Sequence, residues 1–172
     1  MNARDHFLML ARYNVWATDR LLDRHVARLS DDEYRRDAGL FFKSVHGTLN
    51  HLLLAERCLW FERFANGVSP KRRLNEEVHA DRAALQAALK QAVRGWIPAI
   101  ESWDVARFEG TLHYTSTEGV TRTVPFAPAL THVFNHGTHH RGQITAALTA
   151  LGHDAPELDL LFPVLAQATK QP

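Results

Sequence analysis

The 172-residue sequence has a single cysteine, no long apolar run and no excess of charge of either sign. The lone Cys58 excludes an internal disulfide and fits a reducing compartment. No run of about 18 uninterrupted apolar residues occurs, so neither membrane insertion nor secretion is supported. With 20 basic and 19 acidic residues, the chain lacks the basic surface that nucleic-acid-binding proteins need. We therefore expect a cytoplasmic protein that binds neither nucleic acid nor membrane.

The apolar residues, 45% of the chain, recur mainly with helical spacing. Residues 1–172 are expected to form a single domain, because this length suits one well-buried core. Four long helices are predicted, over about residues 4–27, 44–66, 75–103 and 125–151. Two alternating stretches, 107–114 and 120–124, flank a turn and predict a β-hairpin. The fold class is therefore all-α: a four-helix bundle with a small β-hairpin inserted before the last long helix.

The sequences of the second and third helices also indicate where these helices begin or end and how they are buried. Ser44 is the expected N-cap of the second helix, and Pro98 is expected to kink or end the third. From Leu52 to Phe61 the second helix is apolar on almost every side, which predicts burial against several helices or across a subunit contact. The same helix carries His46 and His51.

The last helix holds four of the eleven histidines within nine residues: His132, His136, His139 and His140. Two histidines four residues apart lie one turn apart on the same face, close enough to hold one metal ion. His140 falls on the apolar stripe of the helix and His136 at its edge, whereas His139 faces away. From the residues alone two interpretations stay open: metal ligation, and hydrogen bonding in the core, directly or through water.

Three further residues are unusual for their positions. Gly137 and Gly142 are disfavoured inside a helix and predict that a neighbouring backbone approaches closely. Asn14 lies on the apolar stripe of the first helix. Either it makes an internal hydrogen bond or it contacts a functional site.

Three segments together resemble the DinB family of damage-inducible four-helix-bundle proteins. They are residues 11–17, residues 44–57 with Trp60, and residues 135–144, and they span nearly the whole chain. The resemblance implies up-down-down-up connectivity, a homodimer, and one divalent metal ion per chain held by His51, His136 and His140. His46, His132 and His139 are then not ligands. The family is similar to bacterial thiol transferases and to a thiol-dependent maleylpyruvate isomerase.

Three neutral imidazoles leave an open position on a zinc, nickel or other first-row ion, as in catalytic rather than structural sites. At that position a low-molecular-weight thiol would become a thiolate, and a water molecule would become hydroxide. We therefore expect a metal-dependent enzyme, an S-transferase acting on a small electrophilic substrate. The alternatives are a metal-hydroxide hydrolase and a non-catalytic metal-binding or dimerising stress-response protein.

The groups that support the ligands are less well determined by the sequence. Glu56 and Asn135 are candidate hydrogen-bond acceptors for the ligand histidines, because such histidines usually donate their second N–H to an oxygen. Each is equally well explained as an ordinary polar residue. Arg141 and Gln143 belong to the third segment and have no assigned role.

Overall fold

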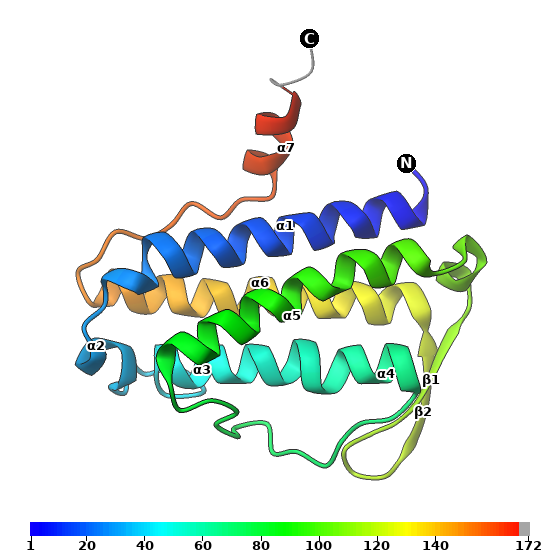
Figure 1. The fold of residues 1–172 in the computed structure, drawn as a ribbon, viewed down its shortest axis with the longest axis horizontal. Coiled ribbons are helices and arrows are strands. Elements are labelled where there is room, and N and C mark those ends of the chain that lie inside the picture. The colour runs from blue at the N-terminus through cyan, green and yellow to red at the C-terminus, as the bar shows by residue number, and fades with distance from the viewer. Residues whose placement is uncertain (169–172) are drawn as a thin grey trace.

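The computed structural model describes residues 1–168. Its long helices are α1 (Ala3–Arg24), α3 (Val45–Leu53), α5 (Arg82–Ser102) and α6 (Phe126–Ala150). A π-helical stretch, Leu54–Trp60, continues α3 into α4 (Phe61–Asn66), so these segments form one rod. In Figure 1, α1 and α6 run in one direction, whereas the α3–α4 rod and α5 run in the other. The predicted four-helix bundle and its up-down-down-up connectivity are confirmed.

The helices pack in a square arrangement. Both α1 and α3 contact α5 and α6, which places α1 and α3 at opposite corners. The short helix α2 (Asp31–Arg35) begins at a capping box formed by Ser30 and Glu33. The last helix, α7 (Leu161–Ala168), stands away from the bundle in Figure 1.

The β-hairpin lies directly before α6, as predicted. Strand β1 (Thr111–Thr115) pairs antiparallel with β2 (Thr121–Pro125), with Tyr114 opposite Arg122. Gly119 takes a left-handed conformation in the turn, with φ of 80°, which glycine adopts without steric cost. The hairpin contacts α4 and the start of α6, so it covers one end of the bundle.

The apolar core consists of two clusters placed end to end along the bundle. One is aliphatic and includes Leu21, Leu49, Leu53, Leu89 and Ile144. The other is mainly aromatic and includes Phe7, Phe64, Trp96, Phe126 and Phe134. Buried polar residues lie between the two clusters in the sequence of α1, of the α3–α4 rod and of α6, and they include Asn14, Glu56 and Arg141 respectively.

The predicted start of the third helix is wrong. The helix begins at Arg82 rather than near residue 75, because the Asp81 carboxylate accepts the Ala84 amide at 2.7 Å and caps it there. Pro98 does not end the helix early, since α5 continues to Ser102, whereas a kink at Pro98 stays a prediction. Pro98 lies on the exposed side of the helix, where solvent can satisfy the carbonyl that loses its partner, and the buried Ile100 holds the last turn in place.

The apolar second helix is buried largely by its own chain. Leu52, Leu53, Leu54, Ala55 and Leu59 are all buried in the single subunit. Of the two explanations that the sequence allowed, packing against several helices therefore accounts for these residues. The homodimer stays a prediction, which this burial does not support. Within residues 1–168, no helix is both long and apolar enough to cross a bilayer.

Candidate metal centre

Two helices bring the predicted ligands together. The Ser44 hydroxyl accepts the Gly47 amide at 3.0 Å and begins α3, as predicted, and His51 follows two turns later. His136 and His140 lie one turn apart on α6 and face His51. His51 and His140 are 5% and 6% exposed, and His136 is partly buried.

The three imidazoles converge on one point through their Nε2 atoms. The Nε2 atom of His136 lies 3.1 Å from that of His51 and 3.1 Å from that of His140. All three ligand atoms lie within 4.8 Å of one another. Nitrogens bound to a tetrahedral zinc ion at about 2.0–2.1 Å are separated by about 3.3 Å. The geometry therefore fits a single metal ion.

In two of these rings, the hydrogen bond made by Nδ1 shows which ring nitrogen carries the proton. His51 Nδ1 lies 2.8 Å from the carbonyl oxygen of Leu74, and His140 Nδ1 lies 2.7 Å from Gln143 Oε1. Both oxygens accept, so both Nδ1 atoms carry the hydrogen and both Nε2 atoms direct a lone pair at the centre. The N–H of a neutral His136 could satisfy only one of these lone pairs, whereas a metal ion would engage all three rings.

Of the two explanations that the sequence allowed for Glu56 and Asn135, the ordinary polar residue holds for both, and neither supports a candidate ligand. Glu56 bonds to Asn14 instead of a ligand histidine, and Asn135 is exposed with no bond to these histidines in the described chain. The acceptors are the Leu74 carbonyl and Gln143. Gln143 follows His140 by three residues on the same helix face, a spacing that could have indicated it. No side-chain signal marks a backbone carbonyl such as that of Leu74.

The surroundings keep these imidazoles neutral. Burial lowers the pKa of His51 to about 4 and that of His136 to about 3, and it also lowers the pKa of His140. Neutral imidazole is the form that binds metal, so the site needs no deprotonation at neutral pH.

A phenylalanine covers one side of the centre. The Phe42 ring stacks on the His51 ring, with 3.8 Å between their centroids. This contact depends on Gly47, because a Cβ at that position would overlap the carbonyl oxygen of Phe42. Sequence analysis did not single out either residue.

The remaining histidines of the two helices do not join the cluster. The His46 ring bonds to Glu77 at 2.6 Å, and His139 is exposed. The His132 ring lies 5.7 Å from that of His136 and 4.9 Å from that of Trp60, so it lines the approach to the centre. This arrangement agrees with their assignment as non-ligands, which stays a prediction along with metal binding itself.

The three histidines line a cleft of about 700 Å³ that extends toward the β-hairpin. Aromatic side chains form much of its wall: Phe41, Phe42, Trp60 and Tyr114. Because the protein supplies three ligands, an ion held here would keep a coordination position for a molecule in the cleft.

Asn14 makes the internal hydrogen bond that the sequence allowed. Its amide donates to Glu56 Oε2 at 2.8 Å, and its oxygen accepts from Arg141. Burial raises the pKa of the Glu56 carboxyl to about 7. Asn14, Glu56 and Arg141, the buried polar triad, therefore join α1, the α3–α4 rod and α6.

The buried polar triad also explains Gly137. A Cβ there would lie 3.0 Å from Arg141 Nη1 and 3.1 Å from Glu56 Oε1, so side chains rather than a backbone approach this glycine. The prediction for Gly142 is wrong, since nothing lies within 4 Å of a Cβ there.

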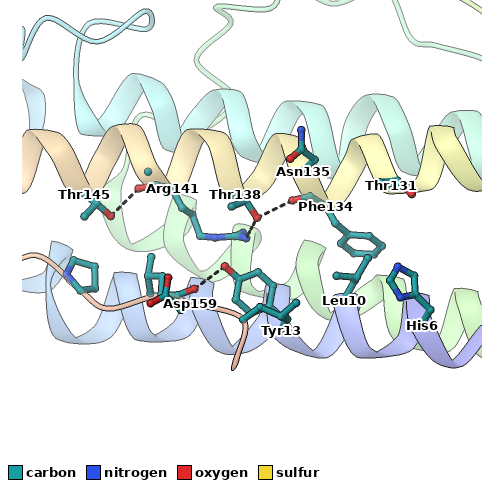
Figure 2. Close-up of a pocket in the computed structure, with 14 residues that line it drawn as sticks. His6, Leu10, Tyr13, Thr131, Phe134, Asn135, Thr138, Arg141, Thr145 and Asp159 are labelled. Atoms are coloured by element: carbon teal, nitrogen blue, oxygen red, sulfur yellow. Dashed lines mark hydrogen bonds between the residues drawn. The ribbon is translucent and has the colours of Figure 1, made fainter. Parts of the chain in front are cut away.

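Arg141 faces away from the histidines. Figure 2 shows it between α6 and α1, where its Nη2 donates to Thr138 Oγ1 at 3.2 Å. A second cavity of about 630 Å³ lies on this side of α6, and none of the three ligand histidines lines it. Near Arg141, the hydroxyl of Tyr13 donates to the carbonyl of Leu158 at 2.7 Å. Of the two unassigned motif residues, Gln143 thus belongs to the candidate metal centre and Arg141 to the packing of the helices.

Comparison with known proteins identifies the family of this chain. The model of the DinB family matches residues 1–171. The chain belongs to the DinB family. It is also 26% identical over 161 residues to Protein DinB of Bacillus subtilis (strain 168), an alignment that covers 90% of this chain and 91% of that protein. The resemblance inferred from the three segments is thereby confirmed.

The first prediction concerns metal content. The protein should hold one divalent ion per chain, and His136→Ala should abolish tight binding, because it removes the nitrogen that lies 3.1 Å from both partners. His139→Ala is the matched control, since it removes an exposed imidazole from the same helix. Elemental analysis after exhaustive dialysis measures both. Equal loss of metal in the two variants would mean that the ion binds elsewhere.

The second prediction concerns the buried polar triad. Gly137→Ala should lower the free energy of unfolding by about 1–3 kcal/mol, because the new methyl group crowds Arg141 and Glu56. Gly142→Ala should raise it by about 0.5–1 kcal/mol, because this exposed position has room for a methyl group. Urea denaturation measures both changes. A stabilising Gly137→Ala would show that the triad accommodates the methyl group without strain.

Proposed function

We propose that this protein is a metal-dependent enzyme that transfers a low-molecular-weight thiol to a small electrophile. One observation carries the proposal: the Nε2 atoms of three buried or partly buried imidazoles converge on one point on the wall of an open cleft. A structural zinc site has four protein ligands and no access for substrate, whereas three ligands beside a cleft are typical of catalysis.

A divalent zinc, nickel or other first-row ion bound here would supply positive charge that lowers the pKa of a thiol or a water molecule at its open position. The chain's own residues orient the imidazoles that would hold the ion. Leu74 and Gln143 fix the rings of His51 and His140. The aromatic side chains of the cleft wall provide an apolar surface for the electrophile.

The transfer balances without a further reactant. The thiol loses its proton to solvent, and the sulfur lone pair forms a bond to the electrophilic carbon. The leaving group departs with the bonding electron pair and takes up a proton. No group in this step is oxidised or reduced.

Two alternatives remain. Water in place of the thiol would give hydrolysis at the same three histidines. A non-catalytic metal-binding or dimerising stress-response protein would need the metal but no substrate site. The cleft of about 700 Å³ favours an enzyme over the latter, because a purely structural ion needs no such access.

The third prediction tests the thiol chemistry. Adding a small thiol to cobalt-substituted protein should produce a sulfur-to-metal charge-transfer band. The band should already appear at a pH well below the usual thiol pKa of about 8.5, because the cation stabilises the thiolate directly. The band should be lost in His51→Ala and His140→Ala, and it should persist in His139→Ala. Absorption spectroscopy during a pH titration measures it. Turnover of an ester or amide, with no thiol effect on the spectrum, would instead favour hydrolysis.

The fourth prediction concerns assembly and rests on the family. We propose a homodimer, so light scattering at micromolar concentration should give about twice the 19.5 kDa chain mass. Because the chain buries its own second helix, a monomer would also be physically consistent, and observing one would reject this proposal.

A further inference from the structure

The end of the cleft remote from the three histidines holds an arginine in an unusual setting. The guanidinium carbon of Arg63, on α4, lies 4.4 Å from the centre of the Trp60 ring and 4.7 Å from that of Tyr114. Its Nε donates to Ser69 Oγ at 2.7 Å. Three neighbours from three segments therefore hold the guanidinium in one orientation.

The charge of Arg63 has no counter-ion in the protein. Among residues 1–168 no carboxylate lies within ion-pair distance of it, and no protein acceptor meets Nη1 or Nη2. Arg57 on the same rod pairs with Glu62 at 2.7 Å. Arg63 is partly buried, and a partly buried charge without a partner costs free energy that an anion would offset.

The two free Nη groups are suitably placed for an oxyanion. With Nε occupied by Ser69, Nη1 and Nη2 remain as a parallel pair of donors, which matches the two oxygens of a carboxylate or phosphate. The other charged residues on this wall are Arg122 and Glu118. Arg122 Nη2 lies 3.9 Å from Glu118 Oε2, and both side chains are exposed. Their charges therefore largely neutralise each other, which leaves Arg63 as the unbalanced cation of the cleft.

A continuous row of rings connects Arg63 to the candidate metal centre. The His136 ring lies 5.7 Å from that of His132, which lies 4.9 Å from that of Trp60, on which Arg63 stacks. Arg63 follows His51 by twelve residues, a rise of at most about 18 Å, because the π-helical stretch Leu54–Trp60 between them rises less per residue than an α-helix, and the Arg63 side chain reaches back toward Trp60. A ligand that touches both ends must be elongated.

We propose that the cleft selects an elongated molecule that carries a carboxylate or phosphate at the end remote from the metal, and that Arg63 binds this oxyanion through Nη1 and Nη2. The reactive end of the molecule then lies at His51, His136 and His140. In this last respect the inference rests on the proposed function. The oxyanion contact itself depends only on Arg63 and its surroundings.

The experiment uses cobalt-loaded protein and a series of mercaptocarboxylic acids of increasing length, from mercaptoacetate through mercaptohexanoate to mercaptoundecanoate, each with its methyl ester. Calorimetry measures the ratio of ester to acid dissociation constants, and the cobalt spectrum follows the thiol end. Mercaptoalkyl phosphates of matched length distinguish a phosphate preference from a carboxylate preference. The variants are Arg63→Gln and the control Arg57→Gln, which removes a paired arginine from the same rod outside the cleft.

We expect the acid to bind roughly tenfold more tightly than its ester at an intermediate or long chain length, because a charge-assisted bidentate contact is lost in the ester. Mercaptoacetate should show no such preference, since it is too short to reach Arg63. The ratio should fall to about one in Arg63→Gln and stay unchanged in Arg57→Gln. Because acid and ester are compared within each variant, a change in protein stability cancels from the ratio.

The outcomes separate this inference from the proposed function. Equal binding of acid and ester at every length, or an acid preference that survives in Arg63→Gln, would overturn the role of Arg63 even if thiols change the cobalt spectrum. An Arg63-dependent acid preference without any spectral change would support the oxyanion site and contradict thiolate binding at the metal. If neither acids nor esters bind, the inference is wrong.

Discussion

The buried carboxyl group of Glu56 constrains how this bundle can pack. A carboxyl group that is 2% exposed needs partners, and it finds them in Asn14 and, through Asn14, in Arg141. Since these three residues come from three different helices, satisfying them fixes the relative positions of those helices. Apolar contacts alone tolerate small shifts of one helix along another, because they are not directional. The polar contacts between the aliphatic and aromatic clusters therefore define the register in which both clusters pack.

The candidate metal centre depends on that register. His51 belongs to the same rod as Glu56, and His136 and His140 lie on either side of Gly137, the residue that the side chains of Arg141 and Glu56 both approach. A shift of α6 by one turn, about 5.4 Å, would separate the Nε2 atoms that now lie 3.1 Å apart. The buried polar triad on one side of α6 thus holds the imidazoles in place on the other side. Because the triad supplies this rigidity, the histidine site can stay open to solvent.

Much of this arrangement could be predicted from the sequence, and the exceptions share a physical cause. Helical periodicity placed His140 inward and His139 outward, and the cap at Ser44 defined the start of α3, because both signals are local. The sequence did not reveal that Gln143 rather than Glu56 supports a ligand, since that depends on which side chain reaches the ring in three dimensions. The π-helical stretch was also missed, because it has no distinct composition. That α5 continues past Pro98 could not be predicted, because it depends on the exposure of one helix face.

The two acceptors that orient the ligand rings differ in their robustness to mutation. His51 donates to a main-chain carbonyl, which every amino acid at position 74 would provide. Substitution of residue 74 therefore leaves the orientation of the His51 ring unchanged as long as the loop backbone keeps its conformation. His140 donates to the side chain of Gln143, which most single substitutions would remove. Selection for function should therefore act strongly on the identity of residue 143 and weakly on that of residue 74. Among relatives, the two positions should diverge at different rates even though they perform the same physical task.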